Sequence, residues 1–198
     1  MVDKWDNPSI SNMYKYVKRL LDIILGIIIL ILVFPIMIIV YLILKIDLKG
    51  KTIFKQERIG QYKKPYIMYK FKTMKDNRNL PKEKRVTKIS KIIRHSGLDE
   101  LPQLINIIKG DMSFIGPRPF MTNDKLPENS YNPKRYLVRP GVFGNAQASG
   151  RRYITHNEKI RNDLIYVDEI SFKTDFKLFF KTIYVVLSQF RDVFKTKK

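Results

Sequence analysis

The 198-residue chain contains no cysteine and only two histidines, His95 and His156. It therefore forms no disulfide, offers no thiol nucleophile, and has no zinc site built on cysteines or on a cluster of histidines. Acidic residues are also scarce, because 18 aspartates and glutamates face 38 lysines and arginines, for a formal charge of +20. Any metal chemistry is left to carboxylates, which favour a hard cation such as Mg²⁺. The excess positive charge calls for an anionic partner.

Two anionic partners fit such a charge, nucleic acid and an anionic membrane surface. The basic residues are scattered along the chain, and no nucleic-acid-binding motif is present. Residues 23–44 are apolar apart from Gly26, Pro35 and Tyr41. This run of about 22 residues is long enough to span a bilayer. We therefore predict anionic membrane lipids as the partner, and no nucleic acid.

The flanks of the apolar run bear on its topology. Basic residues lie on both sides of it, namely Lys15, Lys18 and Arg19 before it and Lys45, Lys49 and Lys51 after it. Because basic flanks stay in the cytoplasm, both ends are satisfied only if both are cytoplasmic. Pro35 removes a backbone hydrogen bond near the middle and kinks a helix. A spanning helix with a harmless kink is the interpretation that hydropathy alone favours. The flanking charges favour cytoplasmic positions for both ends, and this is our prediction.

The rest of the chain predicts an α+β fold, mostly helical with a small β-hairpin. We divide the chain into a membrane segment, residues 1–50, and a domain on the cytoplasmic face, residues 51–198. The hairpin is predicted from Ile53–Arg58 and Tyr66–Met74 around a turn at residues 60–65. Short helices are predicted at 89–95 and 159–166, and loops at 76–88 and 123–133. A helix at 176–194 carries aromatic residues at helical spacing between lysines, and it either faces the core or is an interfacial amphipathic helix.

The most informative stretch is Ser96–Pro119, SGLDELPQLINIIKGDMSFIGPRP. An adjacent acid pair, Asp99 and Glu100, precedes a helix predicted to begin with Pro102 and to stop at Gly110. Carboxylates at a helix N-terminus tend to stay ionised, and a phosphate can share the same field. Simple N-capping is the alternative for the acid pair alone. The stiff GPRP turn that follows carries one guanidinium suited to phosphate oxygens, and this favours a functional site.

With its flanks, this stretch resembles the bacterial sugar transferase family, the small monotopic polyprenyl phosphoglycosyl transferases. The further residues that carry the resemblance are Lys18, Arg19, Asp22, Phe54, Gln56, Arg58, Gly60, the run Tyr69–Met74, Arg139, Pro140, Gly141, Gly144, Gln147, Gly150, Arg151, Asp163, Tyr166, Val167 and Asp175. They occur in order over roughly residues 14–190, and an ordered set of this kind is far more specific than one motif.

The resemblance implies transfer of a sugar-1-phosphate from a nucleotide sugar, most often a UDP-sugar, to a polyprenyl phosphate such as undecaprenyl phosphate. It places this reaction at the cytoplasmic face of the bacterial cell membrane, as the first membrane step of capsule, exopolysaccharide or glycoprotein assembly. Downstream glycosyltransferases are then potential partners. It also implies that residues 23–44 form a re-entrant helix–break–helix, which dips into one leaflet and returns, with the break at Pro35; this is the topology that we predict.

The same resemblance implies roles for individual residues. Asp99 is the expected nucleophile, forming a covalent phosphosugar intermediate, and Glu100 orients or protonates. Asp99, assisted by Glu100, is expected to hold Mg²⁺. The residues expected to bind phosphate or substrate are Lys70, Lys72, Arg94, Pro117, Arg118, Pro119, Gln147 and Arg151.

Two alternatives come from other functional classes. A catalytically silent, basic membrane-surface scaffold would tolerate the loss of Asp99 and Glu100. A nucleic-acid-binding protein would bind DNA in a salt-sensitive way that does not depend on Asp99. The intact acid pair and the GPRP turn disfavour both.

Overall fold

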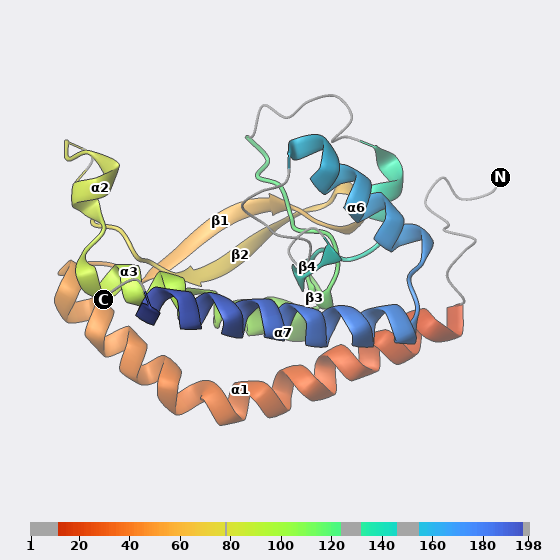
Figure 1. Ribbon diagram of the computed structural model, residues 1–198, viewed down its shortest axis with the longest axis horizontal. Helices are drawn as coiled ribbons and strands as arrows, with labels where there is room; N and C mark the ends of the chain where they lie inside the picture. The colour runs from red at the N-terminus through yellow and green to blue at the C-terminus, as the bar shows by residue number, and fades with distance from the viewer. Residues whose placement is uncertain (1–11, 78, 124–131, 146–154, 196–198) are drawn as a thin grey trace.

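The computed structural model describes residues 12–77, 79–123, 132–145 and 155–195, and its elements follow in chain order (Figure 1). They are α1 (Asn12–Leu48), β1 (Ile53–Ile59), the 3₁₀ turn η1 (Gln61–Lys63), β2 (Pro65–Phe71), α2 (Lys82–Arg85), α3 (Lys88–His95), the 3₁₀ turn η2 (Leu98–Glu100), α4 (Gln103–Lys109), β3 (Ser113–Ile115), the 3₁₀ turn η4 (Pro133–Leu137), β4 (Gly141–Phe143), α6 (His156–Asp168) and α7 (Phe172–Lys195). The predicted α+β class, mostly helical with a small β-hairpin, is confirmed.

The predicted hairpin is strands β1 and β2, paired antiparallel from Ile53 opposite Phe71 to Ile59 opposite Pro65. Its turn closes where the Gly60 amide donates to the Lys64 carbonyl oxygen at 2.8 Å. Strand β2 ends at Phe71, three residues earlier than predicted, so Lys72 lies just outside the strand.

A second, parallel pair of three-residue strands, β3 and β4, was not predicted from the sequence. Ser113 pairs with Gly141, and Ile115 with Phe143. The two segments approach closely here, since a Cβ built on Gly141 would lie 2.1 Å from the Gly116 amide nitrogen. Only glycine fits at such a contact. This pair joins the GPRP turn to the segment that begins Arg139-Pro140-Gly141.

Helix α4 lies at the centre of the domain. Its Leu104 and Ile107 belong to a core that includes Met68 of β2, Tyr166 of α6 and Leu178 of α7. The fully buried Asn106 joins the helix to β2, because its side chain accepts from the Tyr69 amide at 3.0 Å and donates to the Ile67 carbonyl at 2.7 Å. The helix ends where predicted, at Gly110 in the left-handed conformation with φ of 98°. The acid pair is therefore anchored next to a rigid element.

The apolar N-terminal segment is one helix of 37 residues, α1, with Pro35 inside it. Figure 1 shows it as an arc along one side of the domain, beside α7, with both of its ends turned toward the domain. The predicted interruption is thus a bend within a continuous helix and not a break into two helices, since proline removes one hydrogen bond without ending the neighbouring turns. Val40 and Leu44 pack against the domain, whereas Ile31, Leu32 and Phe34 are 68%, 70% and 55% exposed.

Both ends of α1 are bound to the domain by polar contacts. Near the N-terminal end, Arg19 donates to the Ile107 and Ile108 carbonyl oxygens of α4 at 2.6 and 2.7 Å. Near the C-terminal end, Asp47 accepts from Thr87 Oγ1 at 2.5 Å and from Ser90 Oγ at 3.2 Å. The two ends of α1 are thus held by two different elements of the same domain, α4 and the start of α3.

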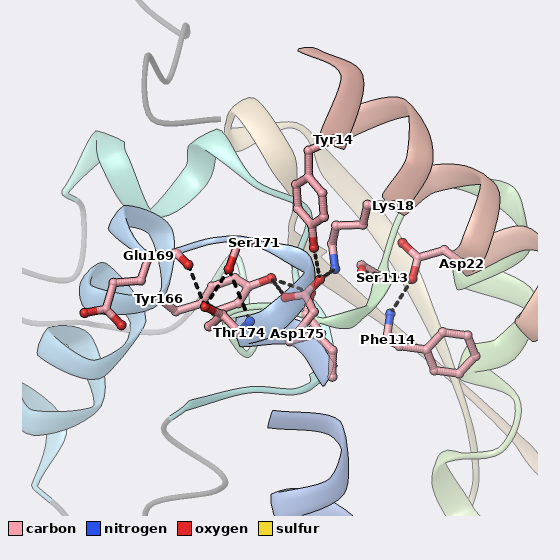
Figure 2. A network of polar contacts seen from close by, with 11 residues as sticks. Tyr14, Lys18, Asp22, Ser113, Phe114, Tyr166, Glu169, Ser171, Thr174 and Asp175 are labelled. Carbon is pink, nitrogen blue, oxygen red and sulfur yellow. Dashed lines mark hydrogen bonds and ion pairs between the residues drawn. The ribbon is translucent and has the colours of Figure 1, made fainter. Parts of the chain in front are cut away.

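A buried polar network, shown in Figure 2, adds to the N-terminal attachment. Asp175 of α7 accepts from the Tyr14 and Tyr166 hydroxyls, each at 2.8 Å, and forms an ion pair with Lys18. Asp22 accepts from the Ser113 hydroxyl and from the Phe114 amide, each at 3.1 Å. These contacts fix α1 against both α7 and β3. Figure 2 also shows Thr174, in the first turn of α7, whose hydroxyl contacts the Ser171 hydroxyl at 2.9 Å and donates to the Glu169 carbonyl oxygen at 2.7 Å.

Candidate active site

The centre of the candidate site is the carboxylate of Glu100, on η2. Its Oε1 accepts from Lys70 Nζ of β2 at 3.1 Å and from Arg118 Nη2 of the GPRP turn at 3.0 Å. Lys70 and Glu100 are mostly buried, and the Arg118 side chain is 35% exposed. Two cations from different elements are thus held at one carboxylate, with the guanidinium still reachable from solvent.

Asp99 lies beside this cluster in a half-buried position. Burial raises the pKa of its carboxyl from 3.8 to about 6, the neighbouring charge of Glu100 adds to the rise, and Lys70 and Arg94 act in the opposite direction. We expected a helix N-terminus to favour the ionised form of this carboxyl, which would lower its pKa. The structure shows the opposite, because the pKa is raised. Leu101 and Pro102 separate Asp99 from the start of α4, so desolvation exceeds any effect of the helix. At neutral pH Asp99 remains about nine-tenths ionised.

Lys70 shows the same effect of burial in the opposite sense. Desolvation lowers the pKa of its ammonium group, the nearby Arg118 lowers it further, and Glu100 counteracts both. Glu100 therefore has an electrostatic role, because it favours the charged form of Lys70 and orients both Lys70 and Arg118 in a partly dry site.

The GPRP turn presents Arg118 between two buried prolines, Pro117 and Pro119. Proline fixes φ near −65°, so the backbone on both sides of Arg118 has little freedom. Pro117 and Pro119 thus shape the turn, and Arg118 supplies the charged group. Arg58 of β1 also supports the turn, donating to the Pro119 carbonyl oxygen at 3.1 Å.

The other predicted site residues do not all lie at the Glu100 cluster. Arg94 is an exposed residue in the last turn of α3 and lies close enough to Asp99 to lower its pKa. Lys72 forms an ion pair with Asp76 instead of joining Lys70 at Glu100, because the strand alternation on which the prediction rested ends at Phe71. Gln147 and Arg151 lie outside the described residues.

Two charged residues behind the site were not predicted as site residues from the sequence. Arg135 of η4 donates to the Arg118 carbonyl oxygen and forms a buried ion pair with Asp163 of α6. Asp163 belonged to the family resemblance, but nothing in the spacing of the two residues indicated that they meet behind the GPRP turn.

The donor set fits Mg²⁺ only together with a substrate. Among the residues that the structure describes, no group of three or more histidines, aspartates and glutamates could hold a metal ion. Asp99 and Glu100 supply two carboxylates, and one Glu100 oxygen already accepts from Lys70 and Arg118. Mg²⁺ is commonly bound by one or two carboxylates, with waters and substrate phosphate oxygens completing its shell. These residues match that pattern.

Known proteins of similar sequence are sugar transferases. The sequence pattern described as bacterial sugar transferase matches residues 13–189. The chain is 39% identical over 176 residues to an uncharacterized sugar transferase, EpsL, of Bacillus subtilis, covering 86% of this chain and 87% of that protein. It is 34% identical over 200 residues to the UDP-glucose:undecaprenyl-phosphate glucose-1-phosphate transferase of Escherichia coli, covering 93% of this chain.

A third relative is the UDP-N-acetylgalactosamine-undecaprenyl-phosphate N-acetylgalactosaminephosphotransferase of Aeromonas hydrophila, 33% identical over 91% of this chain. The chain spans most of the Bacillus protein but only 43% and 46% of the Escherichia and Aeromonas proteins. The region that the family pattern matches includes the acid pair, the GPRP turn and all of α1 except its first residue. The chain belongs to the bacterial sugar transferase family.

Proposed function

We propose that this chain transfers a sugar-1-phosphate from a UDP-sugar to undecaprenyl phosphate, giving an undecaprenyl-diphosphate-sugar and UMP. The observation that carries the proposal is the placement of Asp99 beside the Lys70–Glu100–Arg118 cluster. Relatives named as undecaprenyl-phosphate sugar phosphotransferases support the reaction class. The product would be the starting lipid for assembly of a bacterial surface glycan, on which downstream glycosyltransferases act.

The charges of the site suit a diphosphate. Phosphoryl centres are surrounded by negative oxygens, so catalysis depends mainly on positioning and on cations. Arg118 presents a fork that matches two phosphate oxygens, and Lys70 supplies a second charge. Arg94 adds positive charge next to Asp99. The ligand would replace part of the contact that Arg118 now makes with Glu100.

The proposed chemistry has two balanced steps. An oxygen of ionised Asp99 attacks the phosphorus that bears the sugar, and the bond from that phosphorus to the UMP oxygen breaks. UMP leaves with the electron pair, and the enzyme holds an aspartyl-phosphosugar. An oxygen of undecaprenyl phosphate then attacks the same phosphorus and breaks its bond to Asp99, which regenerates the carboxylate. Glu100 orients Arg118 and Lys70 in both steps.

Asp99 and Glu100 are the residues that would hold Mg²⁺. When bound, it would neutralise the diphosphate and stabilise the charge of the leaving group. The chain's own cations are placed to bind the remaining phosphate oxygens.

The attachment of α1 supports a re-entrant placement in the membrane. A spanning helix has its ends on opposite sides of about 30 Å of hydrocarbon. Here Arg19 and Asp47, near the two ends of α1, are both bound by one polar domain. That domain cannot lie on both sides of a bilayer. The bend at Pro35 would dip into one leaflet with the exposed apolar side of α1 toward lipid. The basic flanks on both sides of the apolar run favour the cytoplasmic face for the domain.

Helix α7 adds a second surface suited to the membrane interface. Phe172, Phe176, Phe180 and Tyr184 recur every fourth residue and are 59%, 56%, 53% and 66% exposed. Exposed lysines stand beside this aromatic stripe, namely Lys173, Lys177 and Lys181. Aromatic side chains with neighbouring lysines suit an interface with anionic headgroups. Its opposite side, with Leu178 and Thr182, is buried, so α7 both packs on the core and presents an interfacial face.

The deciding experiment follows the covalent step with a UDP-sugar radiolabelled in its sugar. Wild-type protein should retain label without undecaprenyl phosphate and release an equal amount of UMP. Asp99→Asn should abolish both labelling and transfer, because it keeps the size but removes the nucleophilic charge. Glu100→Gln should still take up label but turn over slowly. The mechanism is falsified if Asp99→Asn acquires the label. Absence of UMP release from wild type with a panel of UDP-sugars would overturn the function itself.

A further inference from the structure

The backbone of the GPRP turn is held by four donors in succession. The carbonyl oxygens of Pro117, Arg118, Pro119 and Phe120 accept, in that order, from the Gly141 amide at 3.0 Å, from Arg135 Nη2, from Arg58 Nη1 at 3.1 Å and from the Ile59 amide at 2.9 Å. The donors come from β4, η4 and β1. Three of these four contacts hold neighbours of Arg118, and the contact from Arg135 holds Arg118 itself.

Arg135 is fixed on three sides. Its Nε and Nη2 each lie 2.9 Å from Asp163 Oδ2, and its guanidinium lies 3.9 Å from the centre of the Phe120 ring. The third contact is the Arg118 carbonyl oxygen. The side chains of Arg135 and Asp163 are each only 3% exposed. Arg135 is therefore too buried to act as a direct phosphate ligand.

The ion pair is also poorly arranged for stability alone. Within the described part of the chain, Asp163 Oδ1 is buried without a hydrogen-bond partner. Burial raises the pKa of the Asp163 carboxyl, against the effect of Arg135. Buried ion pairs of this kind often contribute no more to stability than apolar residues of similar size. A gain other than stability would explain why charge is placed here.

We propose that Arg135, oriented by Asp163, is a positioning residue for Arg118: it fixes the backbone from which the phosphate-binding guanidinium projects. This inference rests on the proposed function, in which Arg118 binds the diphosphate. Loss of the Arg135 contact would leave the Arg118 carbonyl without this donor, and the ψ angle of Arg118, which the flanking prolines do not fix directly, would be less restrained. A small rotation there displaces the guanidinium at the end of its long side chain, and phosphate recognition by a fork depends on such placement.

The test compares two changes at the ion pair with a matched control. Arg135→Lys keeps the charge beside Asp163 but loses the fork that reaches both Asp163 and Arg118. The double variant Arg135→Met, Asp163→Leu removes both buried charges together, so that neither is left unpaired. The control is Lys134→Met, Asp168→Asn, which breaks an exposed ion pair between the same two elements, η4 and α6. Each is made with and without Arg118→Met, and kcat, KM for the UDP-sugar, Kd for UDP and thermal unfolding are measured.

We expect both Arg135 changes to raise KM and the Kd for UDP about tenfold, the size of one lost charge-assisted contact. The control should stay within twofold of wild type. In the Arg118→Met background the Arg135 changes should add no further loss, because residues that act through one another are not additive. Thermal unfolding of the double variant should stay near that of wild type.

Several results overturn the inference while leaving the proposed function intact. One is an active wild type whose Arg135 variants keep KM and the Kd for UDP within twofold. Another is a loss of UDP affinity in the Arg135 variants that multiplies with the loss caused by Arg118→Met. A third is a loss of UDP affinity that is no larger than the fraction of unfolded protein explains. If the double variant does not fold, Arg135→Lys alone decides. If wild type has no transferase activity, the proposed function fails, and the Kd values for UDP still test the positioning of Arg118.

Discussion

Lys18, in the second turn of α1, forms an ion pair with Asp175 in the first turn of α7, 157 residues later in the chain. Asp175 also accepts from the Tyr14 and Tyr166 hydroxyls, so one carboxylate joins the membrane helix to the C-terminal helix. The side chains of Lys18 and Asp175 are only 15% and 14% exposed. This contact therefore contributes to the position of α1 far more than a surface ion pair would.

The first prediction concerns the Lys18–Asp175 ion pair. Asp175→Asn should lower the free energy of unfolding by about 3 kcal/mol, because it leaves the largely buried Lys18 ammonium without its counter-charge. Urea denaturation in detergent measures the change. Asp168→Asn, which breaks an exposed pair with Lys134, should cost less than about 1 kcal/mol. Equal effects of the two substitutions would contradict a structural role for the Lys18–Asp175 ion pair.

The second prediction concerns the loss of folding stability that comes from holding the Asp99 carboxylate in a partly buried site. Because its pKa is raised from 3.8 to about 6, the folded protein binds more protons than the unfolded chain between these pH values. The free energy of unfolding therefore falls as the pH rises through this window and stays lower above it. At neutral pH, Asp99→Asn should be more stable than wild type by about 2 kcal/mol, and the difference should vanish near pH 4.

Urea denaturation in magnesium-free buffer at several pH values measures this difference. Asp168→Asn serves again as the exposed control and should show no such pH dependence. An Asp99→Asn protein that is no more stable than wild type at neutral pH would show that the site does not desolvate this carboxylate.

The third prediction concerns the guanidinium of Arg118. Arg118→Lys keeps the charge but loses the fork, and it should lower kcat/KM for the UDP-sugar about a hundredfold with unchanged yield and membrane association. Arg161→Lys, an exposed residue of α6, is the matched control and should retain activity. Near-normal transfer by Arg118→Lys would reassign Arg118 to a purely structural role at Glu100.

The fourth prediction concerns topology, and the absence of native cysteine makes single-cysteine labelling unambiguous. Cysteines at Tyr16 and Lys51, which are exposed beyond the two ends of the apolar run, should both be protected from an impermeant reagent in intact cells. Both should react after the cells are opened. A cysteine at Leu32, which is 70% exposed in the structure, should resist the reagent in both cases because lipid covers it. Labelling of Tyr16→Cys from outside would establish a spanning helix.

Features with a strong local signal were predictable from the sequence. The hairpin follows from two runs of branched and aromatic residues around a turn, and α4 from a proline start and a stop at Gly110. The short strands β3 and β4 were missed because three residues carry no detectable period, and their pairing depends on glycines that are distant in sequence.

The site shows the same limit. Asp99, Glu100 and Arg118 were predicted because they lie in one continuous motif, and Lys70 joins them in space. The raised pKa of Asp99 was not predicted, because it depends on burial by residues from several elements. Lys72 was misplaced because one residue decides whether a strand continues. Arg135 and Asp163 become visible only when η4 and α6 are packed together.

The distance along the chain between Lys18 and Asp175 also sets an order of events during synthesis. At about 5–20 residues per second, a ribosome needs roughly 8–30 s to pass from one residue to the other. For most of that time, once Leu48 has been added, the apolar helix α1 exists without α7, its partner in the Lys18–Asp175 contact. Insertion of α1 into lipid, or its protection by a chaperone, must therefore come before the Lys18–Asp175 ion pair forms. A ribosome paused before Asp175 should yield a membrane-bound but protease-sensitive chain.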